Sequence, residues 1–427
     1  MRRRGITDLR AKACASRLVR MSLALGAVVV LASGGPFAAS DRRVSRSQHV
    51  VPSHDQDVVQ SAEPLSEWVN AVEQHTMGSF DVHAARVASW TPEQVGALLR
   101  GIPALLRSPG GARLARRGAM LHADIARLGR WGGSMAWAAA SPRRPLSDAP
   151  SPVVVLTSDG TQEGYGSIAG HWQFGRFLLD SIPRGPSQDP LVVLWYRGAA
   201  AHFVGTRAFG DLELHLLEAE RVLPRDAGIM FHRGVLHEMF ASPTAQGMLE
   251  SAALPTGTRF VIGSPEQELR RAEASLRRAL GLEPGFLEAR LRLGRVLEQL
   301  GQHGQAAAEL GRVAGNTGDK LLLYYARLFL GSAEEALGHA DEARKCYEGA
   351  TALYPGALSA RLALAQVVRQ SGDQSSAVRI VQEALKNPDA GGISASDPWL
   401  QYHYAPGRHA GALFEQAARE CREPERR

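Results

Sequence analysis

The stretch from residue 264 to residue 389 repeats itself, and this repetition constrains the fold more than any other feature of the chain. Counted from Leu287, Tyr324 and Leu358, the same places hold the same kinds of residue, with a period of about 34 to 37 positions. The seventh place is large and apolar, the eighth is glycine or alanine, the fifteenth is glycine and the twentieth is alanine. These residues are Leu293, Gly294, Gly301 and Ala306, then Leu330, Gly331, Gly338 and Ala343, then Leu364, Ala365, Gly372 and Ala377.

Each of these places has a physical role in a pair of antiparallel helices. Small residues at the eighth and twentieth places let the two helices approach closely, and the glycine at the fifteenth place supplies a turn with positive φ. Apolar residues at the seventh and twenty-fourth places fill the space between the helices, and a proline such as Pro355 ends the second helix. The pattern therefore predicts an all-α fold, a solenoid of stacked helix-turn-helix units.

This pattern resembles the tetratricopeptide repeat (TPR). The resemblance covers residues 264–389 and implies a superhelix whose groove binds a protein or peptide partner. In that family the groove is lined by the second, fifth, ninth, twelfth and thirteenth places of each first helix. Here those places hold Glu288, Leu291, Arg295, Glu298 and Gln299, then Tyr325, Leu328, Ser332, Glu335 and Ala336, then Ser359, Leu362, Gln366, Arg369 and Gln370. The alternative for any one of them is an ordinary solvated helix face.

The fifth place narrows the kind of partner that the resemblance implies. TPR domains that hold a chaperone's C-terminal carboxylate use a lysine and asparagine clamp at these places, whereas this chain has Leu291, Leu328 and Leu362 at the fifth place. Leucines flanked by Arg295 and Arg369 are better suited to an amphipathic peptide or helix. We therefore expect a partner segment with one apolar face.

The N-terminal residues have the pattern of a targeting segment. Residues 1–20 contain seven arginines and lysines and a single acid, Asp8, which accounts for the whole formal net charge of +6. An apolar run of about eleven residues follows, whereas a membrane-spanning helix needs roughly 20. We expect a signal peptide or an N-terminal membrane anchor over residues 1–39, and hence an exported protein, periplasmic, secreted or anchored in the inner membrane. The alternative is a misassigned start or no export.

The charge also excludes one class of partner. Because the charges of the residues after position 20 sum to about zero, the basic composition gives no reason to expect nucleic-acid binding.

The sequences at 117–125 and 397–399 resemble those of exported bacterial TPR proteins to which no activity is assigned.

Composition and periodicity divide the remaining chain into segments. The expected order is a flexible linker at 40–63, a helical region at 64–130, a linker or loop at 131–152, a helical region with degenerate repeats and an insertion at 153–263, the repeats at 264–389, and a capping helix with a frayed tail at 390–427.

The segment from residue 189 to residue 280 has a more specific expected organisation. An Arg-Gly pair recurs at Arg197 and Arg233, and this spacing suggests a degenerate repeat that starts near Asp189. In that arrangement a helix at 228–240 pairs with one at 266–280, and residues 241–263 are an insertion between them.

Motifs for catalysis or metal binding are weak throughout the sequence. His237 and Glu238 resemble the start of a zincin helix, but the second histidine would stand at position 241, which is Ala241. Cys346 and Cys421 lie far apart in the sequence and form no disulfide or metal-binding pattern. We therefore expect a non-catalytic scaffold with no catalytic residue, no metal and no cofactor.

Two other functions remain open at this point. One is an envelope enzyme or a ligand- or metal-binding protein, with its site between the N-terminal helical region and the repeats. The residues that such a site would use are His122, Asp124, His171, His237 and Glu238. The other is a structural protein that associates with itself.

Overall fold

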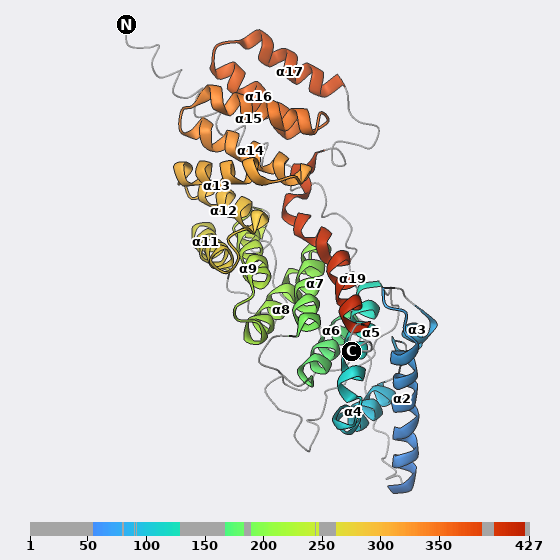
Figure 1. The fold of residues 1–427 in the computed structure, drawn as a ribbon. Helices are drawn as coiled ribbons and strands as arrows, with labels where there is room; N and C mark the ends of the chain where they lie inside the picture. Colours follow the sequence, from blue (N-terminus) through green and yellow to red (C-terminus); the bar gives the residue numbers. More distant parts are fainter. Residues whose placement is uncertain are drawn as a thin grey trace, which may run out of the picture. The chain divides into compact units, whose positions relative to one another are not determined.

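The fold is known from a computed structural model of the 427-residue chain. It describes residues 54–78, 81–88, 90, 92–128, 167–182, 189–243, 245–246, 262–386 and 397–422. Every regular element in these ranges is helical, which confirms the predicted all-α fold (Figure 1). No helix within the described ranges is long and apolar enough to cross a membrane. The expected leader at 1–39 and the linker at 131–152 lie outside the described residues.

Contacts divide the chain into two compact units. One, here called the N-terminal unit, contains the described residues up to Thr206 together with those from Gly407 onward, and the other, the repeat unit, contains residues 207–406. This division differs from the expected boundaries, because the helices between 153 and 263 are shared between the two units.

The N-terminal unit is a set of helices with a core rich in aromatic side chains. Its helices are α2 (His54–Gln74), α3 (Val82–Ala88), α4 (Pro92–Arg107), α5 (Gly111–Leu128), α6 (Ser167–Asp180), α7 (Pro190–Thr206) and α19 (Ala410–Arg422). Trp68, Trp172 and Trp195 are buried in this core. The expected linker at 40–63 is wrong for residues 54–63, because α2 begins at His54 and Pro64 lies inside it.

The last helix of the chain has a different place from the one that the sequence suggested. It was expected to cap the final repeat, but α19 packs extensively on α7 within the N-terminal unit. The packing is close, since a Cβ on Gly198 of α7 would lie 3.0 Å from the Phe414 ring of α19. The proposed repeat that starts near Asp189 is also not formed, because α7 has α19 as its main neighbour.

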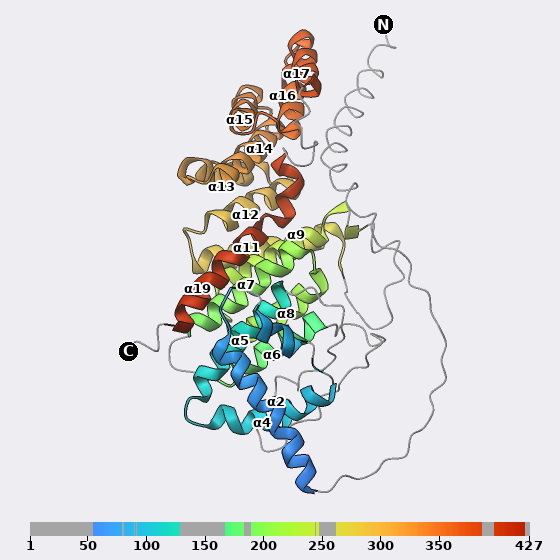
Figure 2. The same ribbon diagram turned by 90° about the vertical axis from the view of Figure 1, so that its right-hand side faces the viewer.

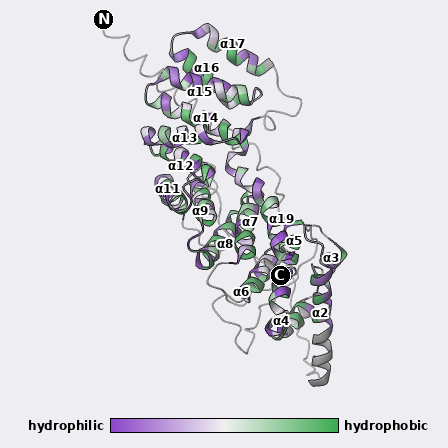
Figure 3. Cartoon of the chain, viewed as in Figure 1, coloured by the Kyte–Doolittle hydropathy of each residue, from purple (hydrophilic) through white to green (hydrophobic). Residues whose placement is uncertain are grey.

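The repeat unit is built from helices that pack mainly on their neighbours in sequence. They are α8 (Phe209–Val222), α9 (Ala227–Phe240), α11 (Pro265–Leu282), α12 (Leu287–Gln299), α13 (His303–Asn316), α14 (Lys320–Ala336), α15 (Ala340–Leu353), α16 (Leu358–Gln370) and α17 (Gln374–Lys386). They stack in order in both views, and each carries hydrophobic and hydrophilic residues (Figures 2 and 3). The expected pairing of α9 with α11 is present.

The sequence explains where these helices begin and turn. Ser264 and Gln267 form a capping box at the start of α11, and the Asp319 carboxylate accepts hydrogen bonds from two backbone N–H groups at the start of α14. The predicted turn glycines Gly301, Gly338 and Gly372 have φ values of 76°, 83° and 97°, a region that favours glycine.

Close approach within each hairpin follows from the small residues at the predicted places. A Cβ on Gly294 would lie 2.5 Å from Leu310, and one on Gly331 would lie 2.5 Å from the Tyr347 ring. Ala343 is fully buried at the contact between α14 and α15. The helix-turn-helix solenoid is therefore confirmed, together with the register of its repeats.

A further helical segment, η1 (Pro398–His409), follows the last hairpin. Its residues up to Pro406 belong to the repeat unit. From Asp397 the chain lies against α9, α12, α14 and α16 instead of continuing beyond α17. This return shapes the candidate site.

Candidate protein-binding groove

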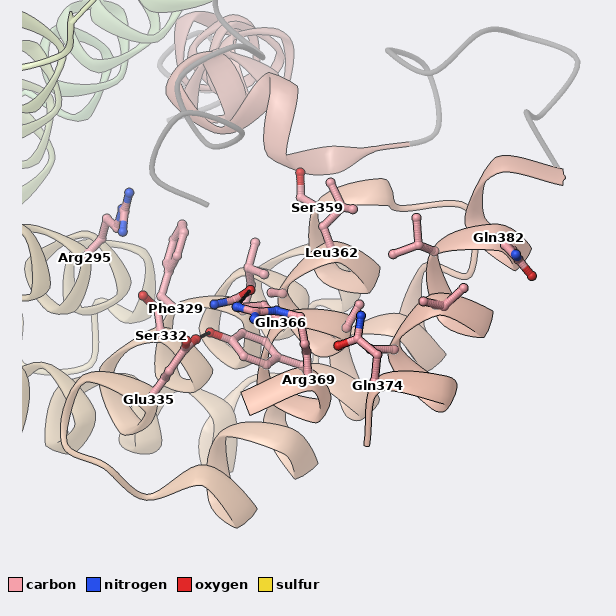
Figure 4. Close-up of a pocket in the computed structure, with 17 residues that line it drawn as sticks. Arg295, Phe329, Ser332, Glu335, Ser359, Leu362, Gln366, Arg369, Gln374 and Gln382 are labelled. Carbon is pink, nitrogen blue, oxygen red and sulfur yellow. Dashed lines mark hydrogen bonds between the residues drawn. The ribbon is translucent and has the colours of Figure 1, made fainter. Parts of the chain in front are cut away.

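A cavity of about 520 Å³ opens in the repeat unit, lined by residues from both the first and the second helices of its hairpins (Figure 4). Its lining comes from α12, α14, α15, α16 and α17, and the labelled side chains of α14 and α16 converge on it. The residues are Arg295, Leu328, Phe329, Ser332, Glu335, Tyr347, Ser359, Leu362, Ala363, Ala365, Gln366, Arg369, Gln374, Ala377, Val378, Val381 and Gln382. A volume of this size is typical of a ligand pocket, for which the usual range is about 300–1,000 Å³.

The lining is mostly apolar, with a polar rim. Phe329 and Tyr347 are buried, Leu362 is half-buried, and Val378 is 44% exposed, so the apolar surface is open to a partner. The small side chains of Ala365 and Ala377 line the cavity and take up little of its space. An apolar side chain of a partner could enter this space.

Glu335 is held at the rim by hydrogen bonds from two neighbours. The Tyr347 hydroxyl donates to it over 3.1 Å, and the Gln370 amide donates over 3.0 Å. Burial raises the pKa of Glu335, although both hydrogen bonds act in the opposite direction. Burial also raises the pKa of Tyr347 well above its usual value, so this hydroxyl remains a donor at any physiological pH.

Arg295 stands where α12 meets the cavity. Its guanidinium pairs with Glu298, which also accepts a 3.1 Å hydrogen bond from the Ser332 hydroxyl. The Arg295 Cζ lies 4.9 Å from the centre of the Phe329 ring and 5.3 Å from that of Trp399. The charge of Arg295 is thus already compensated, and its side chain forms a wall of the cavity.

The chain's own segment 397–406, here called the return segment, occupies the neighbouring helix faces. Trp399 and Tyr402 pack edge-on against Phe329, with ring centres 5.5 Å and 5.0 Å from it. The Tyr325 hydroxyl donates to the Pro398 carbonyl over 2.6 Å. The rings of Trp399 and Tyr402 are buried, so this part of the groove is filled.

A buried ion pair fixes the middle of the return segment. Arg292 of α12 donates to the Glu238 carboxylate and to the Tyr402 carbonyl, each over 2.7 Å, and its Cζ lies 4.3 Å from the centre of the Tyr402 ring. The Tyr402 hydroxyl donates to the same Glu238 over 2.8 Å. Arg292 and Glu238 are each only 1% exposed as side chains, so the two charges depend on each other.

Comparison with known proteins agrees with this architecture. Models of the tetratricopeptide-repeat family match residues 266–330 and 326–367. The chain carries tetratricopeptide repeats. Such repeats are protein-interaction modules, and the chain is a protein-binding scaffold of this kind.

Two solved structures illustrate the wider likeness. "MamA 41-end from Desulfovibrio magneticus RS-1" is 18% identical, with 47% of this chain and 98% of that chain covered and a TM-score of 0.36. "MamA MSR-1 C2" is 19% identical, with 45% and 95% covered and a TM-score of 0.33. At these TM-scores the likeness supports no conclusion about function. No curated protein matches the chain.

The TPR repeats bring part of the predicted groove together and leave the rest outside the cavity. Its lining contains Arg295, Leu328, Ser332, Glu335, Ser359, Leu362, Gln366 and Arg369. Leu291 and Tyr325 are buried, Glu288 is half-buried and Gln299 is exposed, and none of these four lines the cavity. Glu298 acts through Arg295 and Ser332.

The repeat pattern does not indicate the other half of the site. Tyr347, Ala377, Val378 and Val381 come from the second helices of their hairpins, which the family pattern does not assign to the groove. The return segment was expected only to lead into a cap. Its run of Asp397, Trp399 and Tyr402 was the available signal, because such large aromatic residues need a surface on which to be buried.

The residues suspected of catalysis or metal binding belong to separate hydrogen-bond networks. In the N-terminal unit the Trp68 indole donates to His122 over 3.0 Å, His122 and His171 share a 2.7 Å hydrogen bond, and Asp124 binds His75, Gly78 and Arg127. In the repeat unit His237 binds Glu268 over 2.7 Å, and Glu238 binds Arg292. The described residues contain no group of three or more potential metal ligands.

Proposed function

We propose that this chain is an exported, non-catalytic scaffold that holds a segment of a partner protein in the cavity between α14, α16 and α17. The observation that carries the proposal is the cavity itself, because eight of the residues expected to line a TPR groove surround it. Its apolar walls and polar rim match the anatomy of a protein interface, in which a few apolar anchors are surrounded by polar contacts. The return segment confines the partner to the second half of the array.

The cell envelope is the proposed location of this interaction. The support is the arginine-rich start of the chain, followed by an apolar run and small residues at 36–39. Sequencing the N-terminus of the protein recovered from fractionated cells tests this part separately. A mature N-terminus near position 40, or an intact leader in the inner-membrane fraction, is the expected result, whereas an intact chain among cytosolic proteins contradicts export.

Affinity capture from an envelope extract tests the groove. The variant Leu362→Asp places a charge on the half-buried apolar wall, and Leu385→Asp is its matched control, because Leu385 is 65% exposed on α17 and does not line the cavity. The wild type and Leu385→Asp should retain the same protein, and Leu362→Asp should lose it while keeping its circular dichroism and melting temperature. Binding of the purified partner, measured by calorimetry, then verifies direct contact.

One result of the capture experiment contradicts the proposal. If a folded Leu362→Asp variant retains every partner of the wild type, the cavity is not the binding surface. Leu291 and Leu328 are unsuitable for this test, because they are only 2% and 4% exposed and a charge there would disrupt the fold.

A further inference from the structure

The return segment shows which chemistry the groove of this chain already holds. The Asp397 carboxylate lies at the start of α16, where it accepts hydrogen bonds from the Ser359 N–H over 2.7 Å and from the Tyr324 hydroxyl over 3.2 Å. Trp399 and Tyr402 follow it and pack on Phe329. An acidic residue followed by large apolar side chains is therefore the occupant of the first half of the groove.

The cavity continues directly from this internal interface. Ser359, Phe329 and Arg295 contact the return segment on one side and line the cavity on the other. A partner in the cavity would therefore extend along α16 and α17, over a surface that continues the one the return segment uses. The two halves of the groove can be compared in their apolar and charged groups.

Of the two arginines that line the cavity, one has no ion-pair partner among the described residues. Arg295 is paired with Glu298, and Glu335 is held by Tyr347 and Gln370. Arg369 is exposed, and its guanidinium donates to the neutral Gln366 amide oxygen over 3.1 Å. Among the described residues no carboxylate forms an ion pair with Arg369. A partner can supply that carboxylate, and Figure 4 shows Arg369 at the centre of the lining.

The apolar part of the cavity lies next to this cation. Leu362, Val378 and Val381 provide an open apolar wall, and the amides of Gln366, Gln374 and Gln382 stand around it. We infer that the cavity binds an acidic, apolar segment of a partner protein, with a large apolar side chain against Leu362 and Val381 and a carboxylate on Arg369. The inference rests on the proposed function and names the chemistry of its partner.

The test is a selection of peptides on the purified chain. A phage-displayed library of random 12-residue peptides is selected on the wild type, and the consensus is synthesised with a fluorescent label for anisotropy titrations. We expect an Asp or Glu close to a large aliphatic or aromatic residue. The labelled peptide should bind Leu362→Asp too weakly to measure, and Arg369→Glu should weaken its binding about tenfold or more, because like charges then face each other.

A matched control and a charge swap separate recognition from misfolding. Arg379→Glu makes the same charge change on α17 at an exposed residue outside the cavity lining, and it should bind the peptide as the wild type does. A peptide whose acidic residue is replaced by lysine should lose affinity for the wild type and regain it on Arg369→Glu. This rescue requires a folded variant and a direct charge contact.

Three outcomes would overturn the inference, and they differ in what they leave standing. Selected peptides that Leu362→Asp rejects, but that carry no acid and ignore Arg369→Glu, refute the acidic partner and leave the groove function intact. If no peptide is found whose binding Leu362→Asp abolishes, the groove function fails as well. Concentration-dependent dimerisation that Val378→Asp abolishes, measured by sedimentation, assigns the cavity to a second copy of this chain.

Discussion

The helices of the two units of this chain are packed through different kinds of contact. In the repeat unit, helices that are adjacent in sequence approach closely at Gly294 and Gly331, and the same small residues recur from hairpin to hairpin. In the N-terminal unit, α7 packs on α19, which lies some two hundred residues later, and the core contains a buried chain of polar rings. The packing of the repeat unit is local and repeated, whereas that of the N-terminal unit depends on contacts that occur only once.

The polar chain in the N-terminal unit has a defined order of donors. The Trp68 indole can only donate, so His122 accepts at Nε2 and a neutral His122 carries its proton on Nδ1. His122 then donates to Nδ1 of His171, whose own proton must stand on Nε2. Within the described residues this buried Nε2 has no hydrogen-bond partner. These two hydrogen bonds can therefore form together only when the imidazoles of His122 and His171 are both neutral.

The return segment binds the repeat unit through contacts between residues far apart in the sequence. Of the changes considered, Arg292→Ala should therefore lower the free energy of unfolding the most. It leaves the buried Glu238 carboxylate without its cation, and losing one partner of a buried ion pair typically costs about 3–5 kcal/mol. Hydrogen exchange measured by mass spectrometry reports the free energy of opening region by region. Peptides from α9, α12 and the return segment should lose protection.

Arg312→Ala is the matched control, because its ion pair with Glu309 is largely exposed on the arginine side and should contribute less than about 1 kcal/mol. If Arg292→Ala costs no more than this control, the repeat unit is held by its hairpins alone. The repeat unit would then depend only on contacts between helices adjacent in sequence, whereas the N-terminal unit depends on contacts between distant segments.

A fall in pH should weaken the N-terminal unit through its buried histidines. Burial lowers the pKa of His171 to about 3 and that of His202 to about 4, and it holds the pKa of His122 well below its usual value. Because the unfolded chain takes up these protons first, stability is present above pH 6.5 and is lost as the pH falls towards the folded values. Between the unfolded and folded pKa values each group contributes about 1.4 kcal/mol per pH unit, so two or three of them contribute roughly 3–4 kcal/mol per pH unit.

His171→Gln should flatten this dependence by the share of one group, because glutamine does not titrate. Protection of α5 and α6 against hydrogen exchange, measured between pH 6.5 and 4.5, provides the comparison. An identical slope in the variant and the wild type would mean that His171 is not among the groups that take up protons on unfolding.

The contrast between the units also explains what the sequence could predict. The turn at Gly338 and the contact at Ala343 follow from spacing alone, because both are fixed by residues within one hairpin. The place of α19 and the return segment could not be predicted in this way. Asp397 binds Tyr324 and Ser359, and Tyr402 binds Glu238, through contacts between segments far apart in the chain that no period encodes.

The candidate site divides along the same line. The first-helix positions that reach the cavity, such as Leu362 and Arg369, could be predicted from the repeat register. Leu291 holds the same place in that register as Leu362, and Tyr325 the same place as Ser359, yet Leu291 and Tyr325 are buried. The register thus predicts which face a residue occupies. Whether that face is open depends on where the chain goes after the last repeat.

The smallest expected loss of stability comes from a change at a close contact within one hairpin. Ala343→Leu adds a large side chain at a fully buried contact between α14 and α15, and overpacking of this kind typically costs about 1–3 kcal/mol. Ala340→Leu, at an exposed position in the same helix, controls for the change in helix propensity and should be nearly neutral. Urea unfolding of both variants provides the free energies.

The location of the loss is as informative as its size. In a unit held by neighbouring helices, protection should fall in α14, α15 and the adjoining hairpins and should change little in α2 to α6, because stability in a repeat array is carried by each hairpin and its contacts with the next. An equal loss of protection across the N-terminal unit would mean that the two units unfold together. The difference in packing between the two units would then not make their stabilities independent of each other.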